Sequence, residues 1–264
     1  MKACYELEDN VVEAYRDALT REKSPYSRET LQLLIDNAAV AKREQVAVCH
    51  DTGQCVVILE IGQEICWEGE PLTDMVNEGV RQAYVDGYLR KSVVSDPLDG
   101  RINTGDNTPC HLHTEIVPGD RLHVIVMPKG GGGENMSCFK NLIPADGIEG
   151  VKQYVVDCVQ GAGGKTCPPI IVGVGVGGTM DTCTYIAKKS LLRPIGERNP
   201  NPLYAELEEE LLKEINKTGI GTLGMGGTVT ALDVHVDSLP THIASLPVAV
   251  NFQCHSSRHA DTYI

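Results

Sequence analysis

The sequence lacks the features of membrane, secreted and nucleic-acid-binding proteins. No apolar run approaches the roughly 18 residues that a membrane-spanning helix needs. The first ten residues are acidic and contain no apolar core of a secretory signal, so we expect a cytoplasmic protein. Lysine and arginine number 23 against 36 aspartates and glutamates, which gives a formal net charge of -13. Nucleic acids and anionic membranes are bound through clustered cations, so neither partner is expected.

Paired cysteine motifs are also absent, although the chain contains ten cysteines. No two of them are spaced Cys-x-x-Cys, which excludes a zinc ribbon and the compact ferredoxin spacing. A disulfide framework is unexpected in a chain of this size without a secretory signal. We therefore expect most of the thiols to be small core side chains, with a few exceptions.

The order of predicted elements is typical of a mixed α/β protein. No internal repeat or low-complexity linker divides the 264 residues, so we predict one domain over 1–264 with a helical N-terminal part over about 1–45. That segment should pack on a mixed, partly parallel sheet with flanking helices. Apolar periodicity predicts helices over 11–19, 31–44, 73–89, 148–160, 180–192 and 202–217, and strands over 56–61, 111–117, 121–127, 170–176, 228–236 and 246–252. The strands 111–117 and 121–127 are expected to form an antiparallel hairpin.

Cys167 stands in an unusual setting. It precedes two prolines, which should keep it extended, and then the run Ile170 to Val176, which is β-branched wherever it is not glycine. Such a run indicates a strand buried on both faces. A thiol fixed at the mouth of a buried strand can bind a metal or a cluster, or act as a nucleophile.

Cys49 and Cys254 share this setting with Cys167. Each of the three lies at the end of a strand-like run beside polar or proline residues, and the three are far apart in the sequence. They therefore suit a site assembled by tertiary folding. Three thiolates can hold a [4Fe–4S] cluster and leave one iron open for Lewis-acid chemistry, whereas a fourth protein ligand would favour electron transfer.

Three polar segments accompany these cysteines. Residues 49–53 read Cys-His-Asp-Thr-Gly, which indicates either a reactive cluster or a turn in which Asp51 binds its own backbone. The loop 92–109 is long enough to favour a binding role. Residues 129–135 read Lys-Gly-Gly-Gly-Gly-Glu-Asn; the glycines favour an anion-binding nest beside Lys129 over a flexible linker.

Five ordered segments carry a resemblance to a known family. Residues 49–53, 129–137, 166–169, 192–196 and 245–255 closely resemble the α subunit of class I, iron–sulfur-dependent fumarate hydratases, and the resemblance covers nearly the whole chain. The related L-tartrate dehydratase α subunits share the cysteines and the Cys-Pro-Pro step. Around the glycine segment and the last cysteine this chain is more similar to the fumarases. At His50 the fumarase motif usually has glutamine.

The resemblance implies a hydro-lyase that reversibly hydrates fumarate to (S)-malate, or an L-tartrate or other hydroxy-diacid dehydratase. Cys49, Cys167 and Cys254 would hold a [4Fe–4S] cluster with one open iron. A β subunit, in a heterotetramer, would supply the base and further arginines and a lysine. The residues that would meet the dicarboxylate substrate are the catalytic Asp51 and His242, and the substrate-binding His50, Arg90, Lys129, Gly131, Gly132 and Gly133.

Two other classes of function stay open on the sequence. Gly173, Gly175 and Gly178 match the spacing of a dinucleotide-binding fingerprint after a strand. An iron–sulfur electron carrier would need a fourth cysteine ligand, for which Cys138 and Cys183 are candidates. Arg90 also has a simpler interpretation, as a cation at the C-terminal end of the helix predicted over 73–89.

Overall fold

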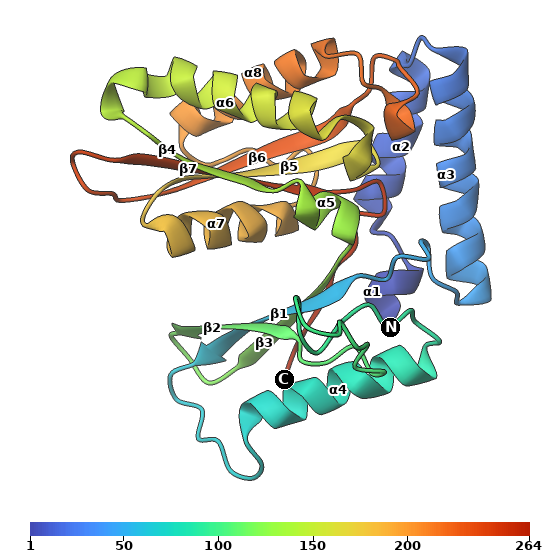
Figure 1. Cartoon of the computed structure of the whole chain (residues 1–264), viewed down its shortest axis with the longest axis vertical. Helices are drawn as coiled ribbons and strands as arrows, with labels where there is room; N and C mark the ends of the chain where they lie inside the picture. Colours follow the sequence, from blue (N-terminus) through green and yellow to red (C-terminus); the bar gives the residue numbers. More distant parts are fainter. The chain divides into compact units, whose positions relative to one another are not determined.

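The computed structural model describes all of residues 1–264 and divides them into two compact units (Figure 1). Unit 1 consists of Met1–Leu7, Asn37–Gly131 and Arg258–Ile264, and unit 2 of Glu8–Asp36 and Gly132–Ser257. Each unit has its own four-stranded mixed sheet, so the predicted mixed α/β class is confirmed, but with two sheets instead of one. Both units are built from segments distant in sequence, which is why no linker marks the division.

The two longer N-terminal helices confirm the prediction, and a short helix that the sequence did not predict precedes them. α1 spans Lys2–Tyr5, α2 Asp9–Arg21 and α3 Pro25–Glu44. Pro25 is the first residue of α3, where its missing N–H removes no helical hydrogen bond. α2 buries one stripe, Val11, Tyr15 and Ala18, within unit 2. None of the helices is both long and apolar enough to cross a membrane.

The sheet of unit 1 has the strand order β2-β1-β3-β8. Its strands are β1 Gln54–Gly62, β2 His111–Val117, β3 Leu122–Lys129 and β8 Ala260–Tyr263. β1 pairs with β2 in parallel and with β3 in antiparallel orientation, so the predicted hairpin of β2 and β3 is wrong. Residues 56–59 of β1 are buried on both faces and need a central position, whereas β2 alternates between more and less exposed residues and suits an edge. The helix α4, Leu72–Asp86, packs its Val80 and Tyr84 against this sheet.

The sheet of unit 2 has the order β4-β7-β5-β6. Its strands are β4 Cys138–Leu142, β5 Ile170–Gly177, β6 Ala231–Leu239 and β7 Leu246–Gln253. The longer helices are α6 Gly147–Ala162, α7 Met180–Lys189 and α8 Pro202–Lys217; the short ones are α5 Gly131–Asn135, η1 Pro144–Asp146, η2 Gly163–Thr166, η3 Ser190–Leu192 and η4 Thr222–Gly224. α6 and α8 cover one face of the sheet and α7 the other (Figure 1). The central strand β5 is buried on both faces, as predicted, and is parallel to β6 and antiparallel to β7.

The glycines of β5 allow α7 to pack closely on the strand. A Cβ atom on Gly173 would lie 2.1 Å from the carbonyl oxygen of Ala187, and one on Gly175 would lie 2.2 Å from that of Cys183. Both glycines stand within the strand, where their amides belong to the sheet, so they do not form the phosphate-binding turn of a dinucleotide fingerprint. The dinucleotide-binding alternative is therefore not favoured.

Cys183 is a core side chain. It is 0% exposed, its Sγ lies 3.3 Å from the carbonyl oxygen of Gly175, and burial raises the pKa of its thiol to about 11. A thiol that is fully buried and bonded within the core is not accessible to a cluster. This removes one of the two candidates for the fourth ligand of an electron carrier.

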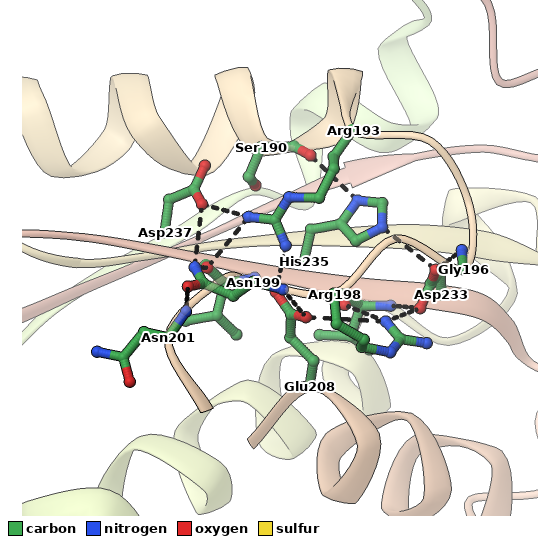
Figure 2. Close-up of polar contacts among 12 residues, drawn as sticks. Ser190, Arg193, Gly196, Arg198, Asn199, Asn201, Glu208, Asp233, His235 and Asp237 are labelled. Carbon is green, nitrogen blue, oxygen red and sulfur yellow. Dashed lines mark hydrogen bonds and ion pairs between the residues drawn. The ribbon is translucent and has the colours of Figure 1, made fainter. Parts of the chain in front are cut away.

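A buried polar network joins α8, β6 and residues 193–199 (Figure 2). Arg193 pairs with Glu208 and Asp237, and the Nη1 atom of Arg198 donates to Asp233 at 2.6 Å. Burial alone would raise the pKa of Asp233, but hydrogen bonds from His235 and the Gly196 N–H outweigh it and lower that pKa. The segment 192–196, one of those that carry the resemblance, thus has a structural role: it fixes α8 to β6.

Candidate active site

Cys167 and Cys254 come together at one end of the sheet of unit 2. Cys167 precedes β5 and Cys254 follows β7, and these antiparallel strands pair with Ile171 opposite Gln253. The backbone N–H of His255 donates to the carbonyl oxygen of Cys167 at 3.0 Å. Neither cysteine is in a disulfide, and both are partly exposed, so a ligand can reach them.

The backbone of Cys167 differs from the expected extended conformation. Its φ is 54° and its ψ is 65°, in the left-handed region that non-glycine residues seldom adopt. Neighbouring bonds hold it there: its N–H donates to the carbonyl oxygen of Gly164 at 3.0 Å, and the Leu223 N–H donates to that of Pro168 at 2.8 Å. Strained conformations of this kind are concentrated at functional sites, where the surrounding structure maintains them.

The glycine segment beside Cys167 is helical. α5 replaces the predicted open nest, and none of the four glycines 130–133 has a positive φ, which a nest of alternating conformation requires. A Cβ atom on Gly132 would lie 2.7 Å from the carbonyl oxygen of Lys165 and 4.0 Å from the Sγ atom of Cys167. Glycine is needed here because it lets the backbone approach closely and leaves the space beside the sulfur free of a side chain.

Tyr15 supports the turn that carries Cys254. The side chain of Tyr15 is 0% exposed, and its hydroxyl donates to the carbonyl oxygen of His255. Burial, with a further contribution from Cys254, raises the pKa of Tyr15, so the hydroxyl keeps its proton and remains a donor. The Oγ atom of Ser256 lies 3.1 Å from the Sγ atom of Cys254. In the sequence Tyr15 is only one member of an apolar helical stripe, and nothing in that stripe signals this role.

Asp51 is the centre of a polar group in unit 1. Its Oδ1 accepts from the N–H of Gly53 at 3.1 Å, which confirms the predicted turn, and its Oδ2 accepts from the N–H of Gly131 at 2.9 Å. The Nη2 atom of Arg258 donates to the carbonyl oxygen of Asp51. Arg258 is 1% exposed, and the sequence analysis does not single it out because it lies far from residues 49–53 in the chain. A Cβ atom on Gly53 would lie 2.3 Å from the carbonyl oxygen of Lys129, which is 2% exposed at the end of β3. The structure therefore brings together the turn of Asp51, Lys129 and the start of the glycine segment.

The remaining predicted residues of unit 1 flank this group. Cys49 is partly exposed, and His50 and Arg90 are exposed. α4 ends at Asp86, four residues before Arg90, so the interpretation of Arg90 as a helix-end cation is wrong. Instead, the hydroxyl of Thr52 donates to the carbonyl oxygen of Arg90 at 2.8 Å, which places Arg90 beside the 49–53 turn.

His242 lies at the other end of the sheet of unit 2. It belongs to the exposed turn between β6 and β7, and its neighbour Thr241 donates to the carbonyl oxygen of Gly178, just beyond the last residue of β5. Cys167 precedes the first residue of the same strand. At about 3.3 Å per residue, the length of β5 separates His242 from Cys167 and Cys254 by roughly 20–25 Å.

The donor set of unit 2 fits part of a cluster site. No three His, Cys, Asp or Glu side chains form a group that could hold a metal ion. Two partly exposed cysteines outside any disulfide lie at one sheet edge, beside a glycine that places no side chain next to the Cys167 sulfur, and they suit two ligands of a thiolate-bound cluster. The third ligand that the sequence analysis names, Cys49, belongs to unit 1.

Comparison with known proteins identifies the class of this chain. Residues 1–263 match the family described as "Fumarate hydratase (Fumerase)", so the chain belongs to that family, whose members are hydro-lyases. The match spans both units, and it confirms the family to which the five segments of the sequence point.

Individual relatives are named as tartrate dehydratase subunits. The chain is 42% identical to the "Putative L(+)-tartrate dehydratase subunit alpha" of Methanocaldococcus jannaschii, over 98% of this chain and 92% of that protein. It is 32% identical to the "L(+)-tartrate dehydratase subunit alpha" of Escherichia coli strain UTI89, over 97% of this chain and 86% of that protein. The strain K12 protein of the same name is 31% identical over the same shares.

Proposed function

We propose that this chain is the α subunit of an iron–sulfur hydro-lyase that interconverts a hydroxy-dicarboxylate and its dehydrated product. The observation that carries the proposal is the position of Cys167 and Cys254, both partly exposed and neither in a disulfide, at one sheet edge of a fumarate hydratase family member. The glycine segment and the last cysteine resemble those of fumarases, which favours (S)-malate and fumarate. The relatives named as tartrate dehydratase subunits make L-tartrate the second candidate.

A [4Fe–4S] cluster is the proposed cofactor, with Cys49, Cys167 and Cys254 as its protein ligands. When bound with one iron free of protein ligands, such a cluster supplies a Lewis acid for a hydroxyl and a carboxylate oxygen. Cys183 is buried and bonded within the core, so the electron carrier with a fourth cysteine receives less support.

The chain's own residues then have separate tasks. The side chain of Asp51, oriented by the N–H groups of Gly53 and Gly131, is proposed to hydrogen-bond the departing hydroxyl oxygen or, in its protonated form, to donate a proton to it and become the carboxylate. Arg90, beside the same turn, would bind a substrate carboxylate through two parallel N–H donors. The other substrate contacts are assigned to His50, Lys129, Gly131, Gly132 and Gly133.

Other chains complete the proposed enzyme. The relatives are named as α subunits, so a β subunit is proposed to supply the base that removes the C3 proton, in a heterotetramer with two α chains. His242 lies at the other end of the sheet of unit 2 from Cys167 and Cys254, so we assign it to the substrate of a neighbouring α chain. The surface around it suits such a contact: Ile243 is 92% exposed and lies with Ile148 and Leu203 beside an apolar hollow of about 330 Å³.

Anaerobic assay of the α chain purified with its β subunit tests this function. The substrates are (S)-malate, L-tartrate and 2-methylmalate, with (R)-malate and D-tartrate as stereochemical controls, and product formation is followed by ultraviolet absorbance. We expect turnover of about 1–10³ s⁻¹ on (S)-malate or L-tartrate and little on the opposite enantiomers. A complex with an intact cluster that dehydrates none of them would contradict the proposal.

A further inference from the structure

The glycine helix α5 needs support from outside itself. It has five residues, Gly131–Asn135, of which three are glycines. Glycine is a poorer helix former than any residue except proline, and isolated helices this short do not persist in water. Gly132 nevertheless lies against the carbonyl oxygen of Lys165 and close to the Sγ atom of Cys167. Other contacts of the chain must therefore hold α5 at this position.

A polar cluster in unit 2 provides such contacts. The Nζ atom of Lys188, on α7, donates to the Oε1 atom of Glu134 at 2.6 Å, and the Nδ2 atom of Asn251, on β7, lies 3.2 Å from Oε2. The same Nδ2 atom lies 2.8 Å from the Oγ atom of Ser137. We call these four residues, Glu134, Ser137, Lys188 and Asn251, the Glu134 clamp.

The clamp connects α5 to the helix α7 and to the strand β7 of unit 2. Asn251 is 5% exposed and sits in β7 three residues before Cys254, opposite Gly173 of the central strand. The side chains of Lys188 and Glu134 are 19% and 35% exposed, so water screens their ion pair only in part. Both anchors belong to elements that pack around β5. Glu134 is therefore bonded to α7 through Lys188 and to β7, the strand that precedes Cys254, through Asn251.

We propose that Glu134, held by Lys188 and Asn251, is a positioning residue that fixes α5 against Cys167. The clamp sets how closely the backbone of Gly132 approaches the sulfur, and so how accessible the thiol is. A role of α5 in catalysis rests on the proposed function, but the placement of α5 against Cys167 by Glu134 does not. A test on the thiol alone therefore separates the two.

The direct test is the alkylation rate of each cysteine in the full-length, cluster-free chain at fixed pH, with iodoacetamide as the probe and peptide mass spectrometry as the readout. In Glu134→Ala the helix α5 loses its anchor, so we expect Cys167 to react at least about fivefold faster through local opening. Cys254 should stay within about twofold of its rate in the unchanged chain, because β7 remains paired on both sides. Cys183, fully buried, should remain protected.

Matched variants separate positioning from general destabilisation. Glu214→Ala also removes a Glu–Lys pair, that with Lys217 in α8, and should leave the rate at Cys167 unchanged. Lys188→Met should accelerate Cys167, and the double variant with Glu134→Ala should exceed neither single variant by much, because both break one clamp. Glu134→Gln keeps an acceptor for Asn251 and should react more slowly than Glu134→Ala.

Two results would overturn the inference. One is a Glu134→Ala chain whose Cys167 reacts no faster than in the unchanged protein. The other is an equal acceleration of Cys167, Cys183 and Cys254, which would show loss of overall stability in place of a local release. The alkylation rates are measured without bound iron, so they test the role of Glu134 even if the cluster proposal fails.

Discussion

Replacing Asp51 by asparagine is expected to lower turnover about 10²–10⁴-fold, the usual contribution of a general acid or base, while iron stays bound. The substitution keeps the size of the side chain and the acceptor for one of its two backbone N–H partners. It removes the group that can carry a proton at the turn of residues 49–53. The measurement is kcat for (S)-malate or L-tartrate dehydration by the anaerobic complex, with iron content determined on the same sample.

The neighbouring Thr52 provides the control for this prediction. Asparagine has one oxygen fewer than aspartate, so Asp51→Asn also loses one of the bonds from Gly53 and Gly131, a structural cost of about 1–3 kcal/mol. Thr52→Val likewise loses one buried hydrogen bond of the same turn, that to the carbonyl oxygen of Arg90, but carries no titrating group. We expect a similar loss of stability and less than about a tenfold loss of kcat. Turnover by Asp51→Asn equal to that of Thr52→Val would remove Asp51 from the chemistry.

Mixing two inactive variants is expected to restore activity if His242 acts on the substrate of another chain. In an assembly with two-fold symmetry, a hybrid of His242→Asn and Asp51→Asn chains contains one site with both residues intact and one site with neither. Random pairing makes half of the assemblies hybrids, so about a quarter of the unchanged activity should return. The measurement is dehydration by the co-expressed chains, compared with each variant alone.

The matching control uses two variants that cannot complement one another. Co-expression of Asp51→Asn with Asp51→Ala should restore nothing, because neither chain supplies the missing carboxylate. A His242→Asn chain that is fully active alone would remove the histidine from the mechanism. Two inactive variants whose hybrids also stay inactive would show that His242 does not act in the site of a second chain.

The sequence predicts the longer elements of this fold well because their cause is local. The apolar stripes of α2, α3, α6 and α8 and the β-branched run of β5 record which faces are buried. The hairpin of β2 and β3 is wrong because strand pairing is a tertiary outcome: β1, more apolar than either, takes the position between them. α1, α5, β4 and β8 were not predicted. α5 consists largely of glycine, and the other three have only four or five residues each, too few to show a clear period.

Some residues of the candidate site could likewise be predicted from the sequence, and others could not. Cys167 and Cys254 could be paired from sequence because each ends a strand-like run, and the antiparallel pairing of β5 and β7 brings those ends together. The roles of Arg258 and Tyr15 could not be predicted from sequence. Arg258 contacts a residue 207 positions away in the chain, and Tyr15 contacts one 240 positions away. The position of His242 could not be predicted either, because the direction of β7 in the sheet decides at which end the turn between β6 and β7 lies.

The iron and sulfide content of anaerobically purified α–β complexes tests the central claim most directly. Cys49→Ala, Cys167→Ala and Cys254→Ala are compared with the unchanged chain and with Cys66→Ala, which removes an exposed thiol. We predict about four iron atoms per unchanged α chain, as a [4Fe–4S] cluster requires, the same in Cys66→Ala, and a large loss in each of the other three. An unchanged complex without iron, or full iron content in any of those three variants, would contradict it.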